Sequence, residues 1–373
     1  MIYFDNAATT KPSRFAIEKA NIFNETNYFN PSALYLGGLN CAKEIKNTKE
    51  TILKYLGGIN HEVIFTSCGT ESDNTAVFGA VKRGCFVTSK GEHSAIYKSF
   101  LELKNRGQSI EFIDLNIDGT VNTDKLYDYV KTNRVDFVSI IHVNNETGGI
   151  NDVNTIAKTL KSINPKIIFH ADGVQAFGKI PYKLSKDIDL YSISAHKINA
   201  LKGVGALIKR KGLNLSPYLI GGGQENGLRS GTENVFGIKV FEYSTVDHYE
   251  KIKENFEKVK TIRDCIKDNL DTKLFTVISS VNSSPYILTV SAVGLRGEVV
   301  MHSLETEKII VGNGSACSSK NRFSRVIEAC GYKEDILDGV IRISFSHENT
   351  IDEAKIAVTK MNETVSKLKG ILN

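Results

Sequence analysis

Residues 166–197 read KIIFHADGVQAFGKIPYKLSKDIDLYSISAHK, and this stretch decides the fold. It holds two short, mainly apolar runs, 167–170 and 190–194, each of a length typical of a buried strand. An ionisable residue follows each run, Asp172 after the first and Lys197 after the second. The pattern predicts strands of an α/β sheet that carry polar side chains at their carboxyl ends, where such sheets bind ligands.

The same alternation of strands and helices extends on both sides of this stretch. Segments 71–83 and 94–106 have the pattern of helices. Seven segments are predicted strands: 63–66, 85–88, 110–114, 136–142, 167–170, 190–194 and 204–208. Strands interleaved with helices in this way favour a mostly parallel, seven-stranded sheet that helices cover on both faces.

The sequence beyond the glycine triplet at 221–223 predicts a second, smaller domain. A long helical stretch over about 233–268 precedes shorter strands near 274–278, 286–290 and 340–344 and a closing helix from Ile351. The 373 residues also exceed the roughly 250–300 at which single cores stop growing. We predict three parts: an N-terminal arm over 1–14, or a part of the small domain there, a large domain over 15–232 and a smaller α+β domain over 233–373.

Composition and charge exclude several classes of protein. Hydrophobic residues make up 41% of the chain and charged residues 24%, and no run of about 18 apolar residues could span a membrane. The first residues, MIYFDNAATT, lack the pattern of an export signal, so we expect a cytoplasmic protein. The net charge of +5 is spread over many lysines without a basic block, so no direct nucleic-acid binding is expected.

The cysteines show no spacing typical of a disulfide framework or a metal site. The six are Cys41, Cys68, Cys85, Cys265, Cys317 and Cys330. Cys317 stands within GNGSACSSK (312–320), whose small polar residues predict an exposed loop and a reactive thiol. Cys330 fits a buried, inert thiol, while Cys68 allows either interpretation.

Lys197 and the residues before it are typical of a lysine that forms a Schiff base. Ser194 and His196 could hold a phosphate and an aldehyde ring, while burial would lower the pKa of the Lys197 amine. A solvated surface lysine is the alternative. Asp172 would suit a pyridoxal cofactor, because that ring needs a carboxylate against its pyridine nitrogen. A helix N-cap is the alternative for this aspartate.

The segment TSCGTES at 66–72 leads from a predicted strand into a predicted helix through hydroxyl residues and a glycine. Free backbone N–H groups and the helix dipole make such a start a suitable site for an anion, here a cofactor phosphate. An ordinary capping box would use the same residues.

Six short motifs follow one another in a single order. They are GTESDN (69–74), EHSA (92–95), HVNNETG (142–148), HK (196–197), RSGT (229–232) and GSAC (314–317). Together they resemble the cysteine desulfurases of the NifS/IscS type, in the class-V aminotransferase family of fold-type-I pyridoxal-phosphate (PLP) enzymes. The resemblance extends from Tyr3 to about Glu348, which is nearly the whole chain.

The resemblance implies PLP as cofactor and a role for each matching residue. Lys197 would hold PLP covalently, Asp172 would pair with the pyridine nitrogen, and His93 would stack on the ring. The other implied contacts are Gly69, Thr70, Ser194 and His196 with the phosphate; Thr232 with the phosphate in the partner subunit of a homodimer; Asn145 and Gln175 with the phenolic oxygen; and Asn145 and Arg342 with the substrate, whose carboxylate Arg342 would clamp.

The implied reaction converts L-cysteine to L-alanine. Lys197 would remove the α-proton, His93 would move protons near the substrate sulfur, and the thiolate of Cys317 would take that sulfur as a persulfide. An acceptor protein, either an iron–sulfur scaffold or a thiolation enzyme for tRNA or a cofactor, would then receive it.

Departures from the family pattern and alternative functions stay open at this point. Members often carry Gly-Pro where this chain has Ala200-Leu201, and Arg where it has Asn226, which puts the turn near Lys197 and the affinity for substrate or acceptor in doubt. A selenocysteine lyase or a class-V aminotransferase would keep Lys197, Asp172 and His93, although transamination leaves Cys317 without a role. From another class, the chain could be an inactive sulfur-transfer scaffold.

Overall fold

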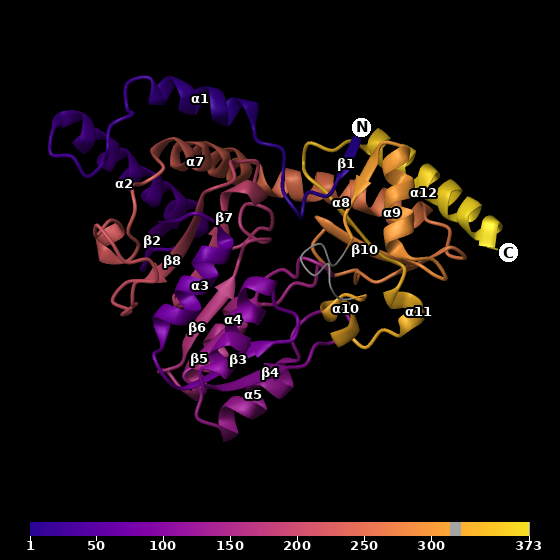
Figure 1. The fold of residues 1–373 in the computed structure, drawn as a ribbon, viewed down its shortest axis with the longest axis horizontal. Coiled ribbons are helices and arrows are strands. Elements are labelled where there is room, and N and C mark those ends of the chain that lie inside the picture. Colours follow the sequence, from indigo (N-terminus) through magenta and orange to yellow (C-terminus); the bar gives the residue numbers. More distant parts are fainter. Residues whose placement is uncertain (314–321, 373) are drawn as a thin grey trace.

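A seven-stranded sheet forms the centre of the larger part of the molecule (Figure 1). The computed structural model describes residues 1–313 and 322–372. The strands are β2 (His61–Thr66), β3 (Cys85–Ser89), β4 (Ser109–Ile113), β5 (Phe137–Ile141), β6 (Ile168–Asp172), β7 (Leu190–Ser194) and β8 (Gly205–Arg210). Their order is β2-β8-β7-β6-β5-β3-β4, and β8 pairs antiparallel with both of its neighbours while the remaining pairs are parallel. The predicted mostly parallel sheet of seven strands is confirmed.

Helices cover both faces of this sheet, as predicted. Because successive side chains of a strand point to opposite faces, Val138 and Ile140 of β5 belong to one hydrophobic core and Phe137 belongs to another. Helices α3 (Gly69–Ala80) and α4 (Ser94–Asn105) pack against the Phe137 face. The opposite face is covered by α1 (Arg14–Asn24), α2 (Leu36–Leu56), α5 (Thr123–Thr132), α6 (Val153–Ile163) and α7 (Val235–Glu250).

A smaller α/β part surrounds a separate core (Figure 1). It holds the antiparallel sheet of β9 (Phe275–Val277), β10 (Ile287–Ala292) and β12 (Val340–Ser344), and the parallel pair of β1 (Ile2–Phe4) and β11 (Ile309–Val311). Its helices are α8 (Ile252–Asn269), α9 (Gly297–Thr306), α10 (Arg325–Ala329), α11 (Glu334–Leu337) and α12 (Ile351–Leu372). The chain therefore begins in the part where it also ends.

The helical stretch expected over 233–268 is divided into two helices. Lys251 separates α7 from α8 with φ −114° and ψ 16°, outside the helical region. Side chains of α7 join the core of the large sheet, whereas those of α8 join the core of the smaller part. Packing thus changes from one core to the other at Lys251, while the domain limits at 14 and 232 stay a prediction.

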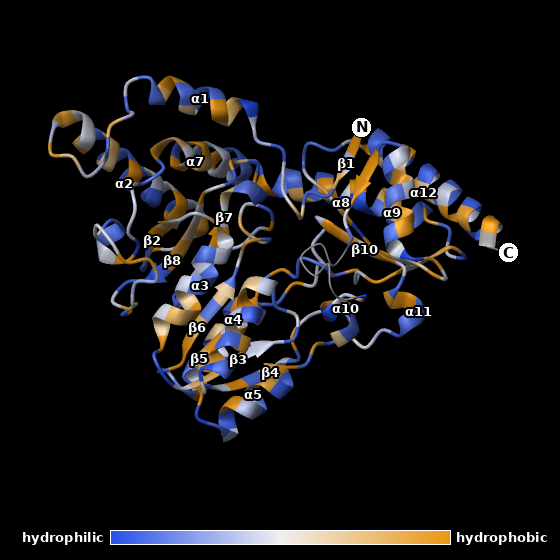
Figure 2. Ribbon diagram, in the orientation of Figure 1, coloured by the Kyte–Doolittle hydropathy of each residue, from blue (hydrophilic) through white to orange (hydrophobic). Residues whose placement is uncertain are grey.

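Apolar and polar residues are distributed differently between the strands and the outer helices. Figure 2 shows apolar residues gathered on the strands, while helices on the outside, such as α5 and α12, mix apolar and polar residues. In the ranges 1–313 and 322–372, no helix combines the length and apolar character that crossing a bilayer would need.

Candidate active site

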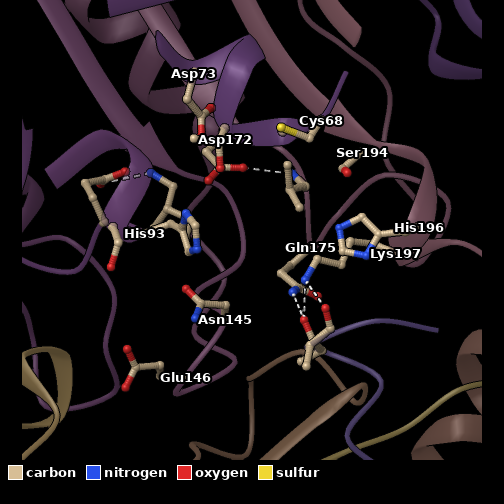
Figure 3. Close-up of a pocket in the computed structure, with 18 of the residues that line it drawn as sticks. Cys68, Asp73, His93, Asn145, Glu146, Asp172, Gln175, Ser194, His196 and Lys197 are labelled. Atoms are coloured by element: carbon tan, nitrogen blue, oxygen red, sulfur yellow. Dashed lines mark hydrogen bonds between the residues drawn. The ribbon is translucent and has the colours of Figure 1, made fainter. Parts of the chain in front are cut away.

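A cavity of about 300 Å³ lies at the carboxyl edge of the large sheet, where the smaller part meets it (Figure 3). Strands β6 and β7 end here and helix α3 begins here. Of the residues predicted for the site, ten line this cavity: Gly69, Thr70, His93, Asn145, Asp172, Gln175, Ser194, His196, Lys197 and Arg342. Cys317 lies outside the residues that the structure describes.

Lys197 is held by the N-terminal segment of the chain. It ends a 3-10 turn, Ala195–Lys197, that directly follows β7. Its Nζ donates to the carbonyl oxygens of Ala7 at 2.6 Å and Ala8 at 2.8 Å (Figure 3). The amine is therefore fixed at the cavity wall by backbone oxygens from a distant part of the sequence.

The turn after Lys197 does not require glycine where the family often has it. Asn199 takes the left-handed conformation with φ 59°, which asparagine tolerates better than most residues. Its N–H donates to Thr10 Oγ1 at 2.7 Å and its Nδ2 donates to Lys11 O at 2.8 Å. Ala200 is fully buried and has no positive φ. The turn next to Lys197 is thus built without the Gly-Pro pair.

Two buried aspartates share one end of the cavity (Figure 3). Asp172 Oδ1 accepts from the N–H of Val174 at 2.9 Å. Burial raises the pKa of Asp172 to about 6, although Lys197 opposes the shift. Asp73 in α3 is 1% exposed, and burial together with Asp172 raises its pKa well above the usual range. A cationic group bound between them would stabilise the ionised Asp172.

His93 is a neutral side chain beside these aspartates. Burial, then the charge of Lys197, lower its pKa to about 4. Its Nδ1 accepts a hydrogen bond from Ala95 N at 3.2 Å, which places the hydrogen of the neutral ring on Nε2. One possible ligand atom each from Asp73, His93 and Asp172 lie within 4.8 Å of one another. A polar group of a ligand placed here would meet all three side chains.

The start of α3 is shaped for close approach of an anion. Gly69 is its first residue, and a Cβ there would lie 2.9 Å from Val174 Cγ2. Ser194 Oγ is buried at the cavity, and no hydrogen-bond partner for it exists among the described residues. His196 bonds through Nδ1 to Thr9 Oγ1 at 3.1 Å. Backbone N–H groups and an unpartnered hydroxyl together fit a phosphate.

Arg342 reaches the cavity from β12. Its Nη1 donates to Asn145 O and its Nη2 to Asp5 Oδ1, both at 2.9 Å. Its Nε and the Oδ1 of Asn145 are buried without a partner in the part of the chain described. An open donor and an open acceptor thus lie together where the resemblance places the substrate.

Thr232 does not line this cavity. It is exposed and contributes to a separate small pocket with Ser67, Glu225 and Arg229. Arg229 donates to Glu71 Oε1 at 2.8 Å, so the RSGT motif is attached to the start of α3 from outside. The role of Thr232 in a partner subunit stays a prediction. Asn226, the other departure, is exposed with φ 56°.

The structure adds cavity residues to which the sequence analysis assigned no role: Asp73, Glu92, Glu146 and Arg325. Asp73, Glu92 and Glu146 lie inside the quoted motifs, so their position near the site could have been inferred. Arg325 carried no such signal. It extends from α10 and donates to the carbonyl oxygens of Lys90 and, at 2.6 Å, of Glu92.

Glu92 is held in the cavity wall as a neutral acid. Its Oε1 accepts from Ser89 Oγ at 2.5 Å and from Ile141 N at 3.0 Å. Burial raises its pKa to about 8. Its Oε2 is buried and unpartnered within the residues that the structure covers.

The chain is similar to known proteins over nearly its whole length. Residues 2–356 match the model of the aminotransferase class-V family. A cysteine desulfurase of Nostoc sp. is 33% identical over 380 residues, which span 100% of this chain and 94% of that protein. A solved NifS-like protein has a TM-score of 0.91 at 31% identity, covering 98% of this chain and 99% of the other. The structure of SspA in complex with cysteine has a TM-score of 0.79 at 26% identity, covering 94% and 100%.

The family model covers most of the chain, and the Nostoc relative covers all of it. The resemblance inferred from the six motifs is thereby confirmed. The chain belongs to the class-V aminotransferase family and, within it, to the cysteine desulfurases of the NifS type.

Proposed function

We propose that the cavity binds PLP and that the protein converts L-cysteine to L-alanine, transferring the sulfur to Cys317. One observation carries the proposal: an amine, Lys197, and a buried carboxyl, Asp172, line the same 300 Å³ cavity with His93. This is the set of groups that a pyridoxal cofactor needs for attachment and for protonation of its ring.

The unpartnered groups of the cavity support this cofactor. The protonated pyridine nitrogen would be the cationic group that stabilises the ionised Asp172 beside Asp73. Ser194 Oγ and the N–H groups at the start of α3 would hold the phosphate, with Thr70 and His196 beside them. When bound, PLP supplies an electron sink for charge that develops on the substrate α-carbon.

The side chains around the sink would orient the substrate and move its protons. The free donor of Arg342 and the free acceptor of Asn145 would bind its carboxylate and amino groups. Lys197 would remove the α-proton and later return a proton. His93, with its hydrogen on Nε2, would donate toward the sulfur side of the substrate.

Sulfur transfer is assigned to Cys317 on its motif alone. Its thiolate would attack the substrate sulfur, forming an S–S bond while the C–S bond breaks. The electron pair of the broken bond stays with carbon, which takes up a proton to become alanine, and the persulfide remains on Cys317. The relative SspA, whose solved structure holds cysteine, supports L-cysteine as substrate.

The partners of the protein are proposed from the family resemblance. We propose a homodimer in which Thr232 contacts the phosphate in the second copy, and its exposure and its position outside the cavity of its own subunit support this contact. The persulfide would pass to an acceptor protein, an iron–sulfur scaffold or a thiolation enzyme. The cytoplasm stays the predicted compartment.

The test combines a spectrum with product analysis. Purified protein loaded with PLP should absorb in the visible range and release alanine and, with a reductant, sulfide in equal amounts from L-cysteine. Cys317→Ala should retain colour and lose sulfide release. Full turnover of Cys317→Ala with cysteine would contradict the persulfide mechanism.

The alternatives give different results in the same test. Faster turnover of L-selenocysteine, independent of Cys317, would indicate a selenocysteine lyase. A coloured protein that transfers amino groups and leaves cysteine intact would indicate an aminotransferase. A protein that cannot be loaded and stays colourless would support the inactive scaffold.

A further inference from the structure

Lys179 is a buried lysine directly behind the cavity. It lies in the segment between β6 and β7 and is 2% exposed. Its Nζ donates to Gln175 Oε1 at 2.8 Å and lies 5.8 Å from the ring centroid of Tyr286. No carboxylate lies within ion-pair distance of it in residues 1–313 or 322–372. Burying an amine without a carboxylate is costly, so its position calls for a reason.

The contact of Lys179 determines which way the Gln175 amide faces. A glutamine amide can exchange its oxygen and nitrogen by turning about its last bond, and its neighbours decide between the two states. Lys179 donates to Oε1. Nε2 then faces the other way and donates one hydrogen to Ala7 O at 2.9 Å. Its second hydrogen is left for the cavity, which Gln175 lines.

The same network reaches Lys197. Ala7 O accepts from both Gln175 Nε2 and Lys197 Nζ, at 2.9 and 2.6 Å (Figure 3). Gln175 and Lys197 are therefore joined through one carbonyl oxygen, and Lys179 is joined to them through the Gln175 amide. Lys197 also acts on Lys179 electrostatically: burial first, then the positive charges of Lys197 and Arg342, lower the pKa of Lys179 to about 7.

From this geometry we infer that Lys179 is a positioning residue that acts through the Gln175 amide, holding an N–H donor toward the phenolic oxygen of the bound cofactor. The inference rests on the proposed function, since it assumes PLP in the cavity. In the opposite orientation, Gln175 Oε1 would face both Ala7 O and the phenolic oxygen, and like dipoles would repel. Lys179 blocks that orientation, because its N–H needs an acceptor on its own side.

The consequence is a shift in the acid–base behaviour of the bound cofactor. An N–H donated to the phenolic oxygen stabilises its anionic form, which lowers the pH at which the visible absorbance of the bound cofactor changes. Lys179→Met removes the donor at nearly equal volume. We expect the pH midpoint of the absorbance change to rise. We also expect the PLP dissociation constant to increase roughly three- to tenfold, which corresponds to the loss of one hydrogen bond.

The experiment is a double-mutant cycle on PLP-loaded full-length protein. Absorbance is titrated against pH, and the PLP dissociation constant is measured, for wild type, Lys179→Met, Gln175→Ala and the double variant. Lys209→Met is the matched control, because Lys209 is also buried, at 4% exposed, but bonds to Leu213 O and Glu62 away from the cavity. Lys179→Arg retains a donor and should restore part of the wild-type midpoint.

Each outcome decides between causes. The inference is supported if Lys179→Met raises the pH midpoint of the absorbance in the wild-type background but not in the Gln175→Ala background. Lys209→Met must leave the midpoint unchanged. An equal shift in both backgrounds would mean that Lys179 acts by its charge alone and would overturn the inference, as would an unshifted Lys179→Met.

A second variant covers failure to fold. If Lys179→Met yields no folded protein, Gln175→Glu is tested, because its carboxylate would pair with Lys179 and present no N–H to the cofactor. An unchanged midpoint in Gln175→Glu would also overturn the inference. A colourless wild type, by contrast, would contradict the proposed function itself.

Discussion

The Nζ atom of Lys197 lies 2.6 Å from the carbonyl oxygen of Ala7, although the two residues are 190 positions apart in the sequence. Ala7 follows β1, which pairs with β11 in the smaller part of the molecule. The amine at the end of β7 is thus positioned by a segment that belongs to the other core. This contact joins both parts of the molecule at the atom on which the proposed chemistry depends.

Loss of the Lys197 amine should abolish both attachment and proton transfer. Lys197→Ala is expected to lower turnover of L-cysteine by on the order of 10²–10⁴, the usual contribution of a general base, and to remove the lysine-bound absorbance. Steady-state alanine release and the visible spectrum measure the two effects. Lys202→Ala, which changes a lysine in the turn beyond the site, serves as control, and equal loss in both variants would contradict the assignment.

The start of α3 should tolerate no side chain at Gly69 unless space is made for it. Gly69→Ala would place a Cβ 2.9 Å from Val174 Cγ2, and crowding of this kind costs about 1–3 kcal/mol. We expect PLP affinity to fall about tenfold in Gly69→Ala and to recover in the double variant with Val174→Ala. Equilibrium dialysis of PLP checks both, and a double variant as weak as the single one would argue against crowding as the cause.

Glu92 should make the cofactor-free protein less stable as pH rises. Burial raises its pKa from 4.5 to about 8, so the folded state binds its proton more tightly than the unfolded state does. Its contribution to stability is therefore full below about pH 4.5 and is lost as pH rises toward about 8. Glu92→Gln keeps the acceptor for Ser89 and Ile141 but cannot ionise.

The free energy of unfolding, measured by denaturant titration at about pH 5 and about pH 9, tests this prediction. The advantage of Glu92→Gln over wild type should grow with pH by on the order of 4 kcal/mol, since each pKa unit is worth about 1.4 kcal/mol. A difference between the two proteins that stays constant over this range would show that Glu92 ionises equally in both states.

Arg325 should tie the smaller part of the molecule to the turn before α4. Its guanidinium donates to the carbonyl oxygens of Lys90 and Glu92, and its Cζ atom lies 3.8 Å from the ring centroid of Tyr97. Arg325→Met is expected to lower the free energy of unfolding by about 2–3 kcal/mol, because hydrogen bonds from a charged donor are lost.

The neighbouring Arg322 offers the matched control for this change. Its side chain is 65% exposed and pairs with Asp338 at 3.0 Å, so Arg322→Met should change stability by less than about 1 kcal/mol. Denaturation of both variants under one condition makes the comparison. Equal effects would mean that the cross-domain contact of Arg325 adds nothing beyond a surface charge.

Much of the large sheet could be predicted from local sequence. The runs at 167–170 and 190–194 became β6 and β7, with ends within two residues of the predicted ones, because strand length and apolar content are local properties. The stretch 233–268 shows where such reasoning stops. Its helical pattern is continuous, yet Lys251 divides it, since α7 and α8 pack on different cores.

Ten of the predicted site residues line one cavity, whereas Thr232 lies outside it and Cys317 lies outside the described residues, and the roles of all of them stay predictions. Asp172 and Lys197 line one cavity, as their positions after strands suggested, and His93, which the resemblance placed at the site, lines it too. Arg325 could not have been found in this way, because a single arginine in a short helix has no pattern that marks it. Lys179 was missed because a single lysine in the segment between β6 and β7 has no such pattern either.

The sequence by itself determined the alternation of strands and helices, the mostly parallel sheet and the family, because hydrophobic period and motif order are read along the chain. Only the tertiary structure decided that Ala7 lies against Lys197, that Lys179 orients Gln175 and that Arg325 contacts the turn at Lys90. These contacts arise when two cores pack together. Their strength comes from burial of polar groups with specific partners, which no local run of residues encodes.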